Sequence, residues 1–193
     1  MQIARLSLIA VLLAVPLQAC VPLAVVGAAA TTAVVHDRRS AGTVLEDQRI
    51  ELAVRRRINS DSAFANGSHI NITSYNNIVL LTGEVPSREA GLRAGEIARG
   101  VDDVRQLHNE LVIAPPSSLA DRSTDSLITT GVKSTLFTVD LPGFDPTRVT
   151  VVTERGTVYL LGLVTRQEAE QATDKARRVN GVQRVVRLFE LID

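Results

Sequence analysis

The sequence predicts an α+β fold in which one five-element unit, ordered helix, strand, strand, helix and strand, occurs twice. Residues 47–113 and 125–192 show the same order of apolar patterns at an offset of 78 or 79 positions, which indicates an internal repeat. The strand-like run "NIVLLTGEV" at 77–85 has a near copy, "GTVYLLGLV", at 156–164. We therefore expect two similar domains, at 47–114 and 125–193, each with a three-stranded sheet and two helices on one face.

The first 20 residues have the layout of an export signal. Arg5 precedes an apolar stretch at 6–15, which is followed by Pro16 and by the sequence Leu-Gln-Ala-Cys at 17–20. Cys20 is the only cysteine, so it cannot form an internal disulfide in an exported chain. The pattern resembles the lipobox of bacterial lipoproteins, which implies removal of residues 1–19 and lipidation of Cys20. An ordinary secretory signal or a buried free cysteine is the alternative.

Residues 20–46 are expected to be the lipidated N-terminus and a flexible tether. The uncharged stretch 21–35 has 15 residues, whereas a spanning helix needs about 20. One uncleaved transmembrane segment over 6–35 is the alternative, but Pro16 and Pro22 interrupt it and it leaves the lipobox unexplained. By the sorting rule that the lipoprotein resemblance implies, Val21 after Cys20 directs the chain to the periplasmic leaflet of the outer membrane.

The first unit follows from its apolar spacing. A helical pattern comes first, two strands with a turn at 75–77 come next, and a second helix and an alternating strand complete the unit. The residues that carry these patterns are, in order, Ile50, Ala53, Val54 and Ile58; Ile70 and Ile72; Val79, Leu81, Gly83 and Val85; Ala90, Ala94, Ile97, Ala98 and Val101; and Leu107, Asn109, Leu111 and Ile113.

The second unit repeats this order after a linker at 115–124, which is rich in Pro and Ser. Asp125 is the predicted N-cap of its first helix, and Thr165 with Glu168 forms the capping box of its second. The apolar positions are Ile128, Val132 and Leu136; Val149 and Val151; Val158, Leu160, Gly162 and Val164; Ala169, Ala172, Ala176 and Val179; and Val185, Arg187, Phe189 and Leu191.

Four residues are expected at positions where the backbone conformation or close packing restricts the side chain. Asn77 and Gly156 occupy the place in a three-residue hairpin loop where φ is positive. Gly83 and Gly162 are expected to let the alanine-lined second helix lie close to the sheet.

The second face of each central strand is also apolar, although no helix of its own unit covers it. Exposed apolar rows of this kind seldom stay in water. We expect the two sheets to pack together through these faces, with Tyr75 and Tyr159 near the seam. The residues expected between the domains are Tyr75, Ile78, Leu80, Thr82, Tyr159, Leu161 and Leu163.

Composition and motifs argue against several classes of function. The formal net charge is zero, aromatic residues make up 3% of the chain, and no nucleic-acid-binding motif occurs. His36, His69 and His108 have no cysteine or carboxylate at metal spacing beside them. There is no phosphate-binding loop and no nucleophile elbow, and Asp140 and Asp145 are typical of a solvated loop. We expect no enzyme, no cofactor, no metal and no nucleic-acid partner.

The order of elements, the strand pattern V-x-L-x-G-x-V and the closing segments "GVDDVRQLHNEL" and "NGVQRVVRLFEL" resemble the BON domain. Residues 20–193 resemble the dual-BON outer-membrane lipoproteins. This resemblance implies a mixed sheet in each unit and a monomer. It also implies binding to anionic phospholipid, such as phosphatidylglycerol or cardiolipin, and support of outer-membrane integrity, including at division sites. A protein-interaction adaptor for the outer-membrane assembly machinery, without specific lipid binding, is the alternative.

The same resemblance places lipid binding on the first helix of the second unit and the loop after it. Because Ile128, Val132 and Leu136 point inward by period, the outward candidates are Leu127, Thr130, Gly131, Lys133, Ser134, Phe137 and Thr138. Leu127 and Phe137 are about three turns apart and can share one side, and Lys133 can meet a lipid phosphate. Relatives tend to carry an aromatic and a basic residue where this chain has Leu127 and Gly131. Alternatively, Leu127 and Phe137 pack against the linker or the first domain.

Overall fold

The protein is described from a computed structural model that covers residues 37–65 and 67–193. The predicted signal peptide, Cys20 and most of the predicted tether lie outside these residues. Within the described ranges no helix is both long and apolar enough to cross a membrane.

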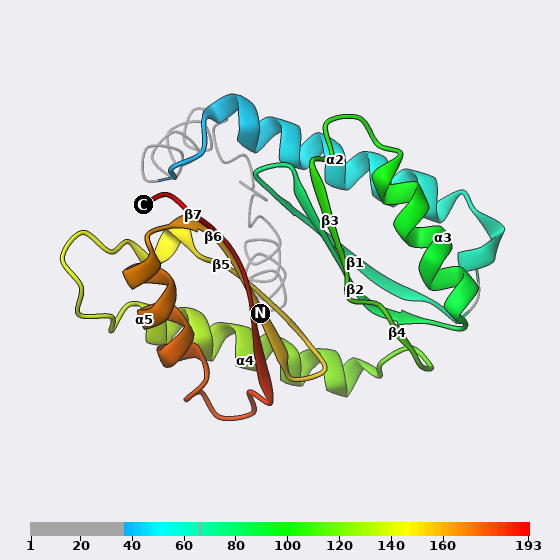
Figure 1. Ribbon diagram of the computed structural model, residues 1–193. Coiled ribbons are helices and arrows are strands. Elements are labelled where there is room, and N and C mark those ends of the chain that lie inside the picture. The colour runs from blue at the N-terminus through cyan, green and yellow to red at the C-terminus, as the bar shows by residue number, and fades with distance from the viewer. Residues whose placement is uncertain (1–36, 66) are drawn as a thin grey trace, which may run out of the picture. The chain divides into compact units, whose positions relative to one another are not determined.

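The first unit contains two helices against a mixed sheet. Its elements are α2 (Ala41–Asn59), a 3₁₀ turn η1 (Ser62–Phe64), β1 (His69–Tyr75), β2 (Ile78–Val85), α3 (Arg88–Arg99), β3 (Gln106–Asn109) and β4 (Val112–Ile113). Strand β2 pairs antiparallel with β1 and parallel with β3 and β4. Figure 1 shows α2 and α3 together along one side of this sheet.

The second unit repeats the arrangement. Its elements are α4 (Leu119–Leu136), η2 (Pro146–Arg148), β5 (Thr150–Glu154), β6 (Thr157–Val164), α5 (Arg166–Ala176) and β7 (Arg184–Leu191). Strand β6 pairs antiparallel with β5 and parallel with β7. The predicted α+β class with two helix-strand-strand-helix-strand units is confirmed. The first sheet has four strands and not the predicted three, because its last predicted strand is divided into β3 and β4, which both pair with β2. Both predicted alanine stripes are buried, and the predicted capping box of α5 forms between Thr165 and Glu168.

Two helices begin earlier than predicted. Helix α4 starts at Leu119, inside the predicted linker, because Ser118 and Asp121 form a capping box there. The prediction of Asp125 as N-cap is therefore wrong, and its side chain is buried one turn and a half into the helix. Helix α2 starts at Ala41 with Ser40 as N-cap, inside the predicted tether.

The hairpin turns are tighter than predicted. Tyr75 pairs with Ile78 and Glu154 with Thr157, so each loop has only two residues. Both residues of each loop have positive φ: Asn76 and Asn77 in the first, and Arg155 and Gly156 in the second. This is the type I′ turn, whose twist matches that of the flanking strands. Positive φ at Asn77 and Gly156 is confirmed, but the three-residue loop is wrong.

The two strand glycines serve a different contact from the one predicted. A Cβ on Gly83 would lie 2.0 Å from the carbonyl oxygen of His69, and Gly83 has φ of 110°. A Cβ on Gly162 would lie 2.7 Å from the carbonyl oxygen of Arg148. The close approach is thus to neighbouring backbone, and the expected approach of the alanine-lined helix is not what requires these glycines.

Most buried apolar side chains of the described residues fall into three clusters. The first lies between the helices and sheet of the first unit, and the second lies in the same place in the second unit. The third combines residues of both units on the faces that the helices leave open. Its buried members are Tyr75, Leu80, Tyr159 and Leu161, and the partly buried Val152, Leu163, Val186 and Leu188 pack against them.

Candidate functional site

Helix α4 has one buried side and one side in solvent. Ile128, Val132 and Leu136 are in the core of the second unit. On the other side, Leu127 and Phe137 are 71% and 72% exposed. The alternative that these two side chains pack against the linker or the first domain is therefore wrong.

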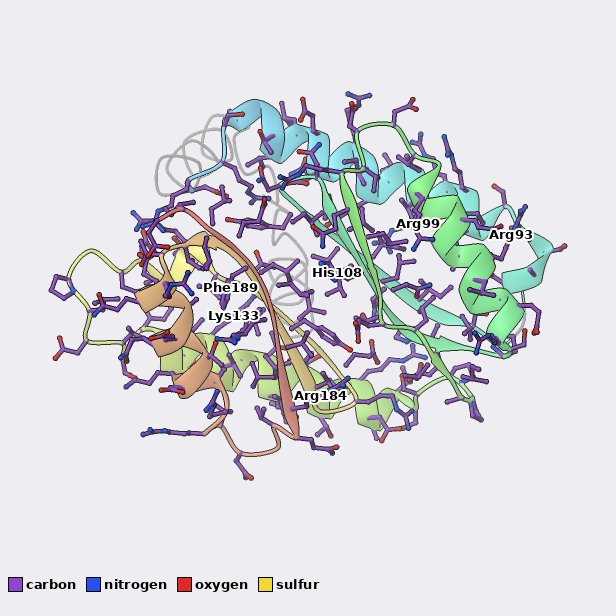
Figure 2. The ribbon with its side chains drawn as sticks, in the orientation of Figure 1. Arg93, Arg99, His108, Lys133, Arg184 and Phe189 are labelled. Carbon is purple, nitrogen blue, oxygen red and sulfur yellow. The ribbon has the colours of Figure 1, made fainter. Side chains whose placement is uncertain are left out.

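The remaining predicted residues of this helix lie as follows. Thr130, Lys133, Ser134 and Thr138 are exposed, and Figure 2 shows Lys133 on α4. Gly131 is half-buried, and a Cβ added there would lie 3.0 Å from a methyl carbon of Val179.

Leu119 belongs to the same surface, although its place in the predicted linker gave no sign of this. It is 82% exposed and lies five full turns before Phe137, so both point in the same direction. Leu127 lies about 80° around the helix from that line. Residue 119 lies in the predicted linker, and the helical spacing that relates it to Phe137 holds only if the helix extends that far. We call Leu119, Leu127 and Phe137, with the small residues between them, the α4 stripe.

The α4 stripe carries no charge. Between its three large side chains the helix presents Ser123, Thr130 and Ser134, all exposed, and α4 is described throughout its length. The Thr130 hydroxyl donates to the Ser126 carbonyl at 2.9 Å. Such bonds satisfy a hydroxyl inside the helix and reduce the energy needed to remove it from water. The Thr130 hydroxyl is therefore easier to transfer to an apolar environment than a free hydroxyl.

Two lysines lie beside the end of the α4 stripe. Lys133 is exposed in the last turn of α4. The Lys175 ammonium donates to the carbonyl and hydroxyl oxygens of Thr138 at 2.9 and 3.1 Å. Beyond the helix, Phe144 packs against the second core and is not free to extend outward. The site thus combines an elongated apolar stripe with two cations at one end.

The residues predicted between the domains are enclosed. Six of the seven are buried and Leu163 is half-buried. Ile78 and Thr82 lie outside the third apolar cluster. The Tyr75 hydroxyl accepts a hydrogen bond from the Leu163 amide at 3.3 Å. Burial raises the pKa of Tyr75, although that hydrogen bond opposes the shift.

The end of the predicted tether also contacts the second unit. The Arg38 guanidinium donates to both carboxylate oxygens of Glu168, at 2.6 and 2.9 Å, and to the Leu163 carbonyl. Arg39 lies with its guanidinium carbon 3.9 Å from the centre of the Tyr75 ring. From residue 38 onward the structure therefore shows ordered contacts where a flexible tether was predicted.

A polar cluster at the seam joins residues that lie far apart in the sequence. His69 lies beside Glu84, 3.4 Å from its carboxylate, and Glu154 adjoins both. The expectation that no carboxylate lies at metal spacing beside His69 is wrong. Glu84 and Glu154 are distant from His69 in the sequence, and only strand pairing and packing bring them close to it. Burial raises the pKa of Glu154, and the hydrogen bond from Asn71 opposes this shift.

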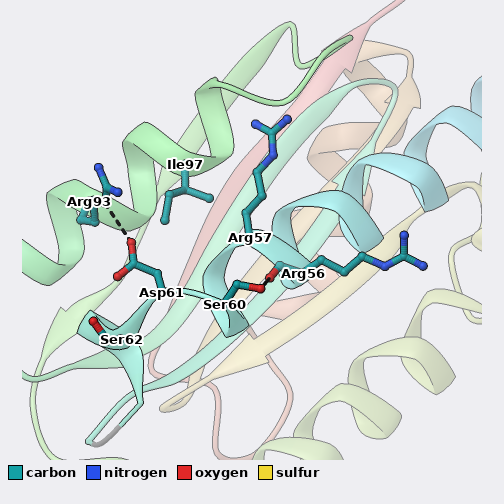
Figure 3. A pocket seen from close by; sticks show the side chains of 7 residues that line it. All are labelled: Arg56, Arg57, Ser60, Asp61, Ser62, Arg93 and Ile97. Atoms are coloured by element: carbon teal, nitrogen blue, oxygen red, sulfur yellow. Dashed lines mark hydrogen bonds and ion pairs between the residues drawn. The ribbon is translucent and has the colours of Figure 1, made fainter.

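An open hollow lies on the first unit, between the end of α2 and α3. It has a volume of 610 Å³ and is open to solvent. Figure 3 shows its lining, where Arg93 donates to the Asp61 carboxylate at 3.0 Å. The other lining residues are Arg56, Arg57, Ser60, Ser62 and Ile97.

Comparison with known proteins identifies similar chains. The BON domain family matches residues 46–115 and 124–193. The chain is 38% identical over 177 residues to outer membrane lipoprotein DolP of Haemophilus influenzae, covering 92% of this chain and 91% of that protein. It is 33% identical over 156 residues to a 21 kDa hemolysin of Actinobacillus pleuropneumoniae, covering 81% and 79%.

Among solved structures, one of CdsD, a structural protein of the type III secretion system of Chlamydia trachomatis, is 15% identical. It aligns with 76% of this chain and 63% of its own, at a TM-score of 0.30. This likeness is too weak to carry an argument.

Proposed function

Because the chain belongs to the BON-domain family, we propose that it is an outer-membrane lipoprotein that binds anionic phospholipid through the α4 stripe. A relative that matches 92% of the chain is named as an outer membrane lipoprotein. In this proposal Cys20 carries the lipid anchor, the protein faces the periplasm, and it acts as a binding protein and not as an enzyme. Binding to the membrane would support the integrity of the outer membrane, including at division sites.

The single observation that supports this surface most is the exposure of three large apolar side chains along one helix. Fully burying each is worth about 1.5–3 kcal/mol. An apolar stripe along a helix that lies flat on a membrane enters the boundary between headgroups and acyl chains. Lys133 adds about 1 kcal/mol near an anionic surface. Together these terms support a weak, reversible contact.

A weak contact is sufficient for an anchored protein. Acyl chains on Cys20 would hold the two BON units close to the bilayer, so the second contact becomes intramolecular and is governed by an effective concentration. The α4 stripe then decides how the units lie on the membrane, while the anchor keeps them there.

The test uses a chain that lacks residues 1–20, so that no anchor contributes. This chain keeps all elements from α2 to β7. Co-sedimentation with vesicles containing phosphatidylglycerol or cardiolipin is expected to bind it, and vesicles of phosphatidylcholine alone are expected to bind it more weakly. Phe137→Asp and Leu127→Asp are each expected to weaken binding by at least about tenfold, the equivalent of 1.4 kcal/mol.

Leu92→Asp is the matched control, because Leu92 is an exposed leucine on α3 of the first unit, 57% exposed. It is expected to bind vesicles as the unsubstituted chain does. Equal binding by Phe137→Asp would contradict the proposed surface. No binding to any vesicle, together with capture of outer-membrane assembly proteins through Leu127 and Phe137, would favour the adaptor.

A further inference from the structure

Three side chains with metal-binding atoms meet where the two units adjoin. The Nδ1 atom of His69 and carboxylate oxygens of Glu84 and Glu154 lie within 4.8 Å of one another. His69 is at the start of β1, Glu84 is near the end of β2, and Glu154 ends β5. Two ligating atoms therefore come from the first unit and one from the second.

The imidazole presents an unused nitrogen to this cluster. His69 Nδ1 is buried and makes no hydrogen bond, although a buried polar atom normally has a partner. It lies 3.4 Å from Glu84 Oε2. Two ligands of a tetrahedral zinc ion are about 3.3 Å apart, given zinc bonds of about 2.0–2.1 Å. His69 and Glu84 thus already have the spacing of two ligands on one ion.

The two carboxylates are held by other groups, as ligating carboxylates usually are. Glu84 Oε2 accepts a hydrogen bond from the Ser117 amide at 3.0 Å, and the Glu84 side chain is 0% exposed. Glu154 Oε2 accepts one from the Asn71 amide group at 2.8 Å. These partners orient both carboxylates toward His69 without using all of their oxygen lone pairs.

Charge and access also suit a cation. The two carboxylates supply the negative charge of the cluster, and Arg155, 3.3 Å from Glu84 Oε1, offsets part of it. A pocket of 210 Å³ is lined by His69 and Glu154, and also by Asp125. Arg122 contributes to its wall, but its guanidinium donates to Ser117. The pocket thus adjoins two of the three ligand residues, His69 and Glu154.

We propose that His69, Glu84 and Glu154 bind one divalent transition-metal ion, with Zn²⁺ as the best match, and that this ion links the two BON units. One imidazole nitrogen and two carboxylate oxygens are ordinary zinc ligands, and water from the pocket completes four-coordination. The Glu154 oxygen has to move inward by at most about 1.5 Å to reach the ligand spacing. The inference does not depend on the proposed lipid binding, because the α4 stripe is not involved.

The experiment uses the mature lipidated protein in detergent after treatment with a chelator. Isothermal titration with Zn²⁺ is expected to show one ion per chain, and titrations with Mg²⁺ and Ca²⁺ are expected to bind far more weakly. Co²⁺ in place of Zn²⁺ is expected to give the visible absorption of a low-coordinate site. Zn²⁺ is also expected to raise the Tm, because an ion that binds only the folded state stabilises it.

His69→Gln and Glu154→Gln are each expected to weaken Zn²⁺ binding by at least about 100-fold, since losing an outer-shell partner alone weakens it 10- to 100-fold. The glutamine at 154 can still accept the Asn71 hydrogen bond, so this variant is expected to fold. His108→Gln is the matched control, because His108 lies on β3 of the same sheet, outside the cluster. It is expected to keep full affinity and the full shift in Tm.

Far-UV circular dichroism of the metal-free variants checks that each is folded. Zn²⁺ binding of unchanged affinity in folded His69→Gln and Glu154→Gln would overturn the proposal. So would the failure of the unsubstituted protein to bind one Zn²⁺ ion.

Discussion

The carboxylate of Asp125 is expected to hold the second hairpin in place, and its removal is expected to destabilise the second unit strongly. Asp125 projects from α4 and accepts hydrogen bonds from the backbone amides of Arg155 and Gly156, at 2.8 and 2.9 Å. These are the two residues of the type I′ turn between β5 and β6. Asp47 on α2 makes the same contacts with Asn76 and Asn77, both at 2.8 Å. Each unit thus joins its first helix to its hairpin through one buried aspartate.

The magnitude follows from the two bonds. A hydrogen bond to a charged group contributes about 1.5–3 kcal/mol, so Asp125→Ala is expected to lower the free energy of unfolding by about 3–6 kcal/mol. Small domains are stable by about 5–15 kcal/mol in total. Asp125→Asn keeps one oxygen acceptor and loses the other, so its effect is expected to be roughly half that of Asp125→Ala.

The assay is urea unfolding of the chain lacking residues 1–20, followed by far-UV circular dichroism. Asp174→Ala is the matched control, because Asp174 lies exposed on α5 and pairs only with Arg177. It is expected to change the free energy by less than about 0.5 kcal/mol. The reasoning would be refuted if Asp125→Ala changed the free energy as little as the control, or if Asp125→Asn were as damaging as Asp125→Ala.

Two further predictions concern backbone space and a buried acid. Gly83→Ala is expected to lower the free energy of unfolding by at least about 2 kcal/mol, because the new methyl meets the His69 carbonyl. Gly91→Ala in α3 has room and is expected to be stabilising by about 0.5–1 kcal/mol; equal urea midpoints for the two variants would contradict this. Burial raises the pKa of the Glu51 carboxyl group. Its protonated form therefore favours the folded state below the usual value of 4.5. This contribution to stability is lost as the pH rises through the raised pKa. Glu51→Gln is therefore expected to gain stability relative to the unsubstituted chain as pH rises from below 4.5, and a difference independent of pH would contradict the assignment.

Patterns that repeat along the chain determined most of the fold. The two-unit α+β architecture could be predicted because helical and strand periodicities depend only on which side of each element is apolar. The predicted BON resemblance is confirmed by the matches over both units. The apolar second face of β6 pointed to Leu161, which the structure buries in the third apolar cluster.

Two of the errors concern contacts between distant segments. Asp125 has the chemistry of an N-cap, and only the fold places the amides of Arg155 and Gly156 at its carboxylate. The glycine in V-x-L-x-G-x-V is visible in the sequence, but the carbonyl that excludes a side chain there comes from a neighbouring strand or turn.

The sequence by itself predicted the repeat and the family, because both depend on neighbouring residues or on their period. The export signal lies outside the described residues and stays a prediction. Only the tertiary structure decided that Leu119 joins Leu127 and Phe137 on one exposed side of α4. Likewise, only the pairing of β1 with β2 and the meeting of the two units bring His69, Glu84 and Glu154 together. Local pattern fixes which face of an element is apolar, whereas a site made from several elements depends on how those faces pack.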